Sequence, residues 1–95
     1  MKKKKKIQIQ DVKECYVCGD TNVELHHIFM GQKHRKFADE DGLTVWLCPM
    51  HHRISNNSAH MNKEFRLELQ QMAQRRYLQH HNISEWMARY GKNYI

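Results

Sequence analysis

Four side chains that commonly bind zinc stand in two closely spaced pairs in this 95-residue chain. Cys15 and Cys18 have C-x-x-C spacing, and Cys48 and His51 have C-x-x-H spacing. Each pair fits on one turn of chain, and two such pairs can surround a tetrahedral Zn²⁺ ion. Because so short a chain buries only a modest core, an ion contributing about 10 kcal/mol or more would supply much of its stability. The spacing therefore predicts a small domain folded around structural zinc.

Two other interpretations of the cysteines are open from sequence alone. They could be unrelated buried thiols, or Cys15 and Cys18 could form a redox dithiol, although the usual βαβ surroundings are missing. Three cysteines cannot all pair within one chain, which favours a reducing compartment. No apolar run approaches the roughly 20 residues of a membrane span, and no secretory signal is evident. We therefore expect a cytoplasmic protein with no membrane partner.

The net charge of +6 comes mostly from one end of the chain. Lys2–Lys6 supply five positive charges, which leaves +1 for residues 7–95. Because like charges repel and little apolar surface is present, residues 1–12 are expected to form a basic flexible arm. This arm is either a solvated terminus or a segment that binds phosphate. Residues 13–95 are expected to form one domain.

Alternating apolar residues predict two short strands. Residues 23–28 and 43–47 both alternate in the manner of half-buried strands. The segment between them, 29–42, is polar and charged and ends in a turn signal, so we expect a loop there.

Helical periodicity predicts two helices after the strands. Asn62 is the expected N-cap of a helix that runs to about residue 80, and Ser84 is the expected cap of a last helix that stops at Gly91. Together with the strands, these helices predict an α+β fold. The expected core residues are Trp46, Phe65, Leu69 and Tyr77.

A second set of histidines is placed beside the ligand pairs. His26 and His27 are adjacent in the first strand, so their side chains point to opposite faces, and one can hold a metal while the other serves the space beside it. His52 follows the second ligand pair directly, and His60 or Asn56 lies shortly downstream.

These motifs resemble those of the HNH (His-Me finger) endonucleases in their zinc-containing form. The matching segments are Cys15-x-x-Cys18, Leu25-His26-His27-Ile28, Leu47-Cys48-Pro49-Met50-His51-His52 and Ala59-His60. They span about half of the chain and are most similar to small phage-type members. The resemblance implies a zinc-stapled ββα-metal core over residues 13–61, with a C-terminal helical extension over residues 62–95.

The resemblance also implies metal-dependent hydrolysis of phosphodiester bonds in DNA by a phage or prophage enzyme. The catalytic-metal ligands at the matching positions are His26, His52 and His60, with Asn56 as the alternative third ligand. His27 takes the position of the general base that deprotonates the attacking water. The ion would be Mg²⁺, Mn²⁺, Ni²⁺ or Zn²⁺, because Mg²⁺ prefers oxygen ligands whereas the others accept imidazole nitrogen.

The basic cluster of the polar segment is the expected phosphate contact. It consists of Lys33, Arg35 and Lys36, of which Arg35 can grip phosphate bidentately.

One position departs from the family pattern, since no Asn between Asn22 and Asn56 is present to orient the base. Asp41 or a backbone carbonyl would then orient His27. The alternative function is a catalytically weak or inactive zinc-containing module that binds DNA or a phage packaging or replication protein. A purely structural zinc domain is a third interpretation.

Overall fold

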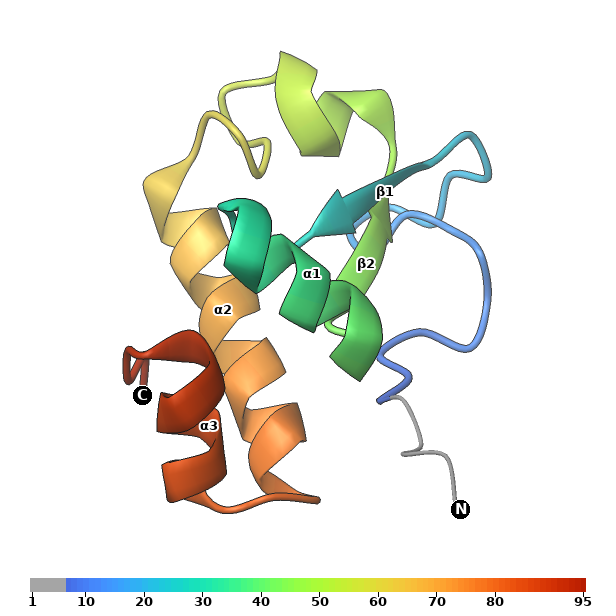
Figure 1. Cartoon of the computed structure of the whole chain (residues 1–95). Coiled ribbons are helices and arrows are strands. Elements are labelled where there is room, and N and C mark those ends of the chain that lie inside the picture. The colour runs from blue at the N-terminus through green and yellow to red at the C-terminus, as the bar shows by residue number, and fades with distance from the viewer. Residues whose placement is uncertain (1–6) are drawn as a thin grey trace.

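Two short strands and longer helices give the chain a small α+β fold (Figure 1). The structure is a computed structural model that describes residues 7–95, so the lysines Lys2–Lys6 lie outside the described residues. The elements follow in the order β1 (Glu24–His27), α1 (Gln32–Asp41), β2 (Thr44–Leu47), η1 (Met50–Ile54), α2 (Lys63–Leu78) and α3 (Ile83–Tyr90). Within residues 7–95, no helix combines the length and apolar character needed to cross a membrane.

The two strands pair in an antiparallel sheet, in which Glu24 is opposite Leu47 and His27 is opposite Thr44. This result confirms the two strands predicted from alternation. This pairing places His26 and His27, at the end of β1, opposite Val45 and Thr44, at the start of β2.

Only one face of β2 is buried. Val45 and Leu47 are buried, whereas Trp46 between them is half-buried and lies under the ammonium group of Lys13, 4.7 Å from the ring centroid. The prediction of Trp46 as a core residue is therefore wrong, because strand alternation turns it to the outer face.

The polar segment between the strands forms the helix α1, which corrects the expected loop. Ala38 is fully buried and Phe37 packs against the core, so a narrow apolar stripe holds an otherwise charged helix in place. The helix ends at Gly42, whose φ of 80° suits the left-handed conformation of a C-cap. Composition misled here because packing stabilises helices that are polar on most of their surface.

The C-terminal end of α1 is fixed to α3. Asp41 accepts hydrogen bonds from Tyr90 Oη (2.7 Å) and Arg89 Nε (2.9 Å), and Glu40 accepts from a second guanidinium nitrogen of Arg89 (3.1 Å). Because α1 also contacts β1, it connects the sheet to the helical half of the molecule.

The predicted α2 is confirmed together with its cap. The side chain of Asn62 accepts a hydrogen bond from the backbone N–H of Phe65 (3.1 Å). Leu69, Ala73 and Tyr77 are buried on one face, and Phe65 is half-buried against the same core.

The cap of the last helix is Asn82, two residues earlier than the predicted cap. Asn82 and Glu85 form a capping box, in which each side chain accepts a hydrogen bond from the other residue's backbone N–H, so Ser84 is not the cap. Gly91 ends α3 as predicted.

An aromatic cluster forms the centre of the helical half. Trp86 and Tyr90 of α3 stack with ring centroids 4.2 Å apart, and Tyr77 of α2 meets Trp86 at 5.3 Å. Phe29, just beyond β1, lies 4.8 Å from Tyr90. The cluster therefore ties the end of the histidine-bearing strand to α2 and α3.

Residues 7–12 differ from the flexible arm expected there. Ile7 and Ile9 pack against the core, and the backbone N–H of Ile7 donates to Asp41 O (2.9 Å). The side-chain oxygen of Gln10 accepts a hydrogen bond from the backbone N–H of Trp46 (2.7 Å). The chain at Ile7 also passes so close to Gly42 that residue 42 must be glycine, because a Cβ there would collide with the carbonyl of Ile7.

Candidate metal centres

The first ligand pair lies on a tight turn before β1. The turn is closed by backbone hydrogen bonds from Gly19 N to Cys15 O (2.9 Å) and from Cys15 N to Asp20 O (2.8 Å). Gly19 has a φ of 78°, a conformation that glycine adopts at little cost. This turn brings the sulfur atoms of Cys15 and Cys18 to the same side, next to the end of β2.

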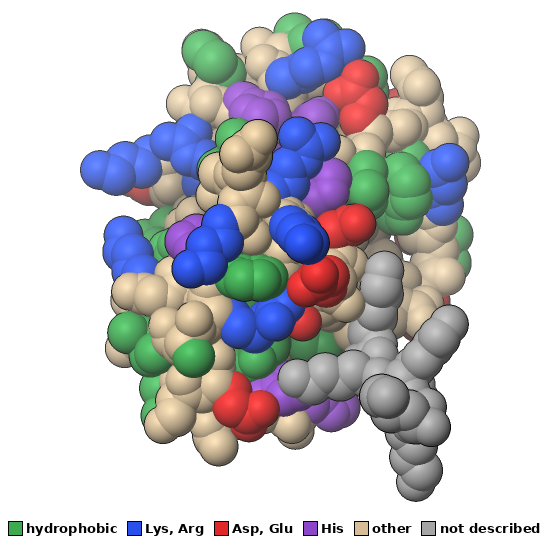
Figure 2. All heavy atoms as spheres, viewed as in Figure 1, with side chains coloured by type: hydrophobic (Ala, Val, Ile, Leu, Met, Phe, Trp, Pro, Cys, Tyr) green, Lys and Arg blue, Asp and Glu red, His purple; other side chains and the backbone are tan. Residues whose placement is uncertain are grey.

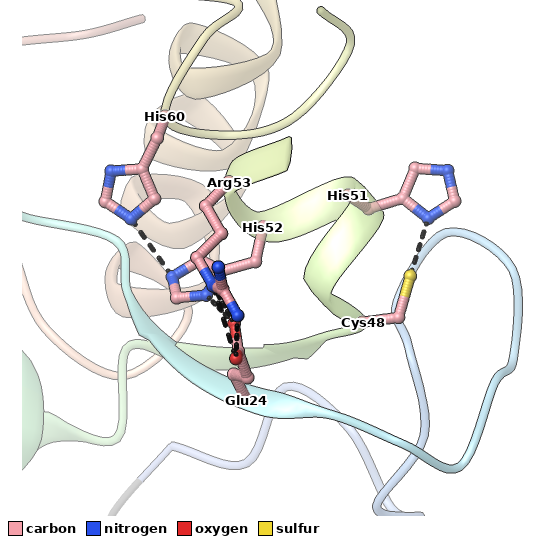
Figure 3. Close-up of polar contacts among 6 residues, drawn as sticks. All are labelled: Glu24, Cys48, His51, His52, Arg53 and His60. Carbon is pink, nitrogen blue, oxygen red and sulfur yellow. Dashed lines mark hydrogen bonds and ion pairs between the residues drawn. The ribbon is translucent and has the colours of Figure 1, made fainter. Parts of the chain in front are cut away.

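The second ligand pair extends from the end of β2 into η1. The Sγ atom of Cys48 lies 3.2 Å from His51 Nδ1 (Figure 3). Across the two pairs, Cys18 Sγ lies 3.8 Å from Cys48 Sγ, and Cys15 Sγ lies 3.6 Å from His51 Nδ1. All four donor atoms are within 4.8 Å of one another. The structure thus brings together the four residues predicted from spacing.

These separations match the edges of a tetrahedral zinc site. Zinc bonds of about 2.3 Å to sulfur and about 2.0 Å to nitrogen imply edges of about 3.8 Å between sulfurs and about 3.5 Å between sulfur and nitrogen. A disulfide would need about 2.05 Å between sulfurs, and all three cysteines are free. The group could therefore bind a zinc-like ion, with all four positions supplied by the protein.

The electrostatic surroundings of Cys15 favour its metal-binding form. Burial acts to raise the pKa of this thiol, but hydrogen bonds from the backbone amides of Cys48 and Cys18 outweigh it and lower the pKa to about 6. A thiolate is the form of cysteine that coordinates metals.

A second group consists of His26 of β1, His52 of η1 and His60, which precedes α2. Their ligand nitrogens lie within 4.8 Å of one another, and the Nε2 atoms of His52 and His60 are 3.1 Å apart. Two ligands with metal bonds of about 2.0–2.1 Å would be about 2.9–3.3 Å apart in octahedral or tetrahedral geometry. The geometry is thus compatible with one ion shared by three imidazoles.

The backbone of η1 explains why these histidines meet. His51 and His52 are consecutive, and Figure 3 shows their rings pointing in different directions, one toward Cys48 and the other toward His60. The carbonyl of His52 accepts a hydrogen bond from the backbone N–H of His60 (3.0 Å), and His51 accepts one from Ala59 (2.8 Å). The returning chain is therefore held against η1 next to His52.

The surroundings of His26 and His60 favour neutral rings. Burial is the main cause that lowers the pKa of His26 to about 4, and the nearby His52 and His60 lower it further. Burial also lowers the pKa of His60. Neutral imidazole is the form that coordinates metals.

Glu24 is a member of this site that the motifs did not reveal. Its Oε1 lies 2.7 Å from His52 Nδ1, and Arg53 donates to both carboxylate oxygens at 3.0–3.3 Å (Figure 3). Hydrogen bonds to Arg53 and then to His52 lower the pKa of Glu24 to about 2. A sequence signal did exist, because residues i and i+2 of a strand share a face, and Glu24 stands two positions before His26.

The histidines of the second group open onto a pocket of about 430 Å³. His27 also lines this pocket, and its Nε2 lies 3.7 Å from Asp39 Oδ1. Asp41, the expected partner of His27, instead binds Tyr90 and Arg89. The acidic side chain beside His27 is therefore Asp39 of α1, two residues before the expected Asp41.

The other candidate residues are divided between the pocket and the open surface. Arg35 lines the pocket, whereas Lys33 and Lys36 are exposed on α1 and do not. Asn56, the alternative third ligand, is exposed and does not line the pocket either. Figure 2 shows histidine side chains beside Lys and Arg side chains on this face of the molecule.

No family model, curated protein or solved structure matches this chain.

Proposed function

We propose that the protein is a metal-dependent DNA endonuclease of the HNH type, derived from a phage or prophage. The observation that carries this proposal is the meeting of His26, His52 and His60 in one pocket that His27 also lines. Three ligands leave positions on an ion open to substrate, as catalytic sites require.

The proposed core is a zinc-stapled ββα-metal unit. Its strands would be β1 and β2, and its helical part would be the segment from η1 into the start of α2. The group of three cysteines and His51 would hold structural zinc, because four protein donors leave no place for water or substrate. The two metal groups would then have separate tasks.

The proposed reaction is hydrolysis of a phosphodiester bond. A divalent ion held by the second histidine group would supply positive charge that offsets the charge developing on the phosphate. His27 would accept the proton of the attacking water as the new bond from oxygen to phosphorus forms and the bond to the leaving oxygen breaks. Arg35, at the rim of the same pocket, would bind a phosphate oxygen.

The charge order of α1 supports a DNA contact. Lys33, Arg35 and Lys36 occupy its first half, and its acidic residues occupy the second. Helices are stabilised by the opposite order, with acidic residues in the first turn and basic residues in the last. Helix stability therefore does not explain why the first half of α1 is basic. A contact between this half of α1 and DNA bound at the pocket would explain it.

Plasmid nicking tests the proposal. Supercoiled DNA would be incubated with the protein and Mg²⁺, Mn²⁺, Ni²⁺ or Zn²⁺, and nicked circles would be quantified on gels. We expect cleavage in at least one metal and a loss of about 100-fold or more in His27→Ala, as is typical for removal of a general base. His80→Ala, at an exposed histidine outside both groups, is the matched control. No cleavage in any metal, or full cleavage by His27→Ala, would refute the proposal.

Two observations favour the alternative of a zinc-containing binding module without cleavage. The separation of 3.7 Å between His27 and Asp39 is too long for a hydrogen bond, and residues 7–95 carry a charge of only +1. Such a module would bind DNA, or a phage packaging or replication protein, equally well after His27→Ala. Its DNA affinity would fall steeply with salt if the lysines Lys2–Lys6 provide it.

A further inference from the structure

Glu24 contacts the second histidine group through a hydrogen bond to the side of His52 that faces away from His60. The carboxylate oxygen is 2.7 Å from Nδ1 of His52, while Nε2 of the same ring is 3.1 Å from Nε2 of His60. One nitrogen of the ring is thus engaged by the carboxylate, and the other faces the group.

This arrangement defines the tautomer of His52. An ionised carboxylate only accepts hydrogen bonds, so Nδ1 of His52 must carry the proton. In the neutral ring, the lone pair is then on Nε2, the nitrogen that faces His60. Without the carboxylate, the ring could rotate, or its proton could move from Nδ1 to Nε2. Either change would remove a metal-binding lone pair from the second histidine group.

Arg53 holds the carboxylate in place. Its Nε donates to Oε1 of Glu24 (3.0 Å), and a terminal nitrogen donates to Oε2 (3.1 Å). This paired geometry restricts rotation of the carboxylate. Because Arg53 directly follows His52 in η1, one turn of backbone carries both the ring and the group that fixes its carboxylate partner.

We propose that Glu24 is a positioning residue of the second metal site, where it holds His52 with the proton on Nδ1 and Nε2 ready to bind a divalent ion. The inference rests on the metal site of the proposed function, but it does not require that the protein cut DNA. Carboxylates that orient a ligating histidine commonly contribute 10- to 100-fold in metal affinity.

Nitrogen NMR of the histidine rings tests the tautomer directly. Spectra would be recorded on the protein with one equivalent of zinc, and His52 would be assigned by comparison with His52→Gln. We expect the Nδ1–H tautomer for His52 in the wild type and in Glu24→Gln, whose amide oxygen can still accept. In Glu24→Ala we expect a shift toward Nε2–H. An Nε2–H tautomer in the wild type would overturn the proposal.

Metal titration tests the consequence. Ni²⁺ would be titrated calorimetrically into the same zinc-containing proteins, with Glu68→Ala, at an exposed glutamate of α2, as the matched control. We expect Glu24→Ala to bind Ni²⁺ about 10- to 100-fold more weakly, Glu24→Gln to lose less, and Glu68→Ala to be unchanged. Equal affinity of Glu24→Ala and the wild type, including no Ni²⁺ binding by either, would overturn the proposal.

These results separate the two claims. If Glu24→Ala has the expected effects on the His52 tautomer and on Ni²⁺ affinity but the wild type does not cleave DNA, the endonuclease proposal is refuted and the role of Glu24 stands. If instead Glu24→Ala cleaves DNA and binds Ni²⁺ as the wild type does, the role of Glu24 is refuted and the endonuclease proposal stands.

Discussion

Removal of zinc from the group of three cysteines and His51 is expected to unfold the domain. The ion would join the turn that carries Cys15 and Cys18 to the end of β2 and to η1. Structural zinc contributes about 10–16 kcal/mol in small metal-folded peptides. At about 0.05–0.15 kcal/mol per residue, a chain of this size has a total stability of about 5–14 kcal/mol. Loss of the ion would therefore leave the free energy of unfolding near or below zero.

The two tryptophans report this unfolding from opposite halves of the molecule. Trp46 is half-buried on β2, and Trp86 of α3 is fully buried and contacts Tyr77 of α2. We would titrate the zinc-containing protein with a strong chelator and record fluorescence and far-ultraviolet circular dichroism. Both signals should change over the same range, because the aromatic cluster and α1 couple the two halves. His51→Ala should behave as the chelated protein does, and His80→Ala as the untreated protein.

One result would refute this reasoning. If the chelated protein keeps its circular dichroism and its melting temperature within a few degrees, the hydrophobic core is sufficient and the four donors are not a folding site.

Three further predictions follow from the core and from α1. Trp86→Ala should lower the free energy of unfolding in urea by about 3–5 kcal/mol because it empties a fully buried site, and a loss below about 1 kcal/mol would contradict that packing. Burial, and then the hydrogen bond to Asp41, raise the pKa of Tyr90 above its usual 10.0, so the fold favours the neutral phenol. The contribution of Tyr90 to the free energy of unfolding should be fully present below pH 10 and should decrease as the pH rises above it. Tyr90→Phe should make this decrease smaller in thermal melts. Arg35→Ala should weaken DNA binding in fluorescence anisotropy and reduce the salt slope by about one, whereas Arg75→Ala on the exposed face of α2 should not; equal effects would argue against α1 as the contact.

Ligand spacing was the most reliable sequence signal. The turns that hold Cys15, Cys18, Cys48 and His51 are local, so the relative positions within each pair follow from a few residues of chain. The same holds for β2, where Val45 and Leu47 form one buried face, and for the cap at Asn62, whereas in β1 the polar His26 is buried and the apolar Leu25 is exposed. These features depend little on the rest of the molecule.

Features that depend on long-range packing were missed. The helix α1 is charged over most of its length, and its stability comes from Ala38 and from the contacts of Asp41 with α3. Those same contacts occupy Asp41 and remove it as a partner for His27. Glu24 was overlooked for a similar reason, because its partners His52 and Arg53 lie 28 and 29 residues away in sequence.

The consecutive positions of His51 and His52 also limit how the chain can vary in length. The two residues serve different groups, so the phase of η1 relative to Cys48 sets both at once. Insertion of one residue between Cys48 and His51 would turn both rings by roughly a quarter of a helical turn or more. The group of three cysteines would lose His51 and the second histidine group would lose His52. A compensating change in one group would not restore the ligand of the other. Within the segment from Cys48 to Ser58, we expect length changes to disturb the two rings least at residues 56–57, which are exposed and follow the end of η1.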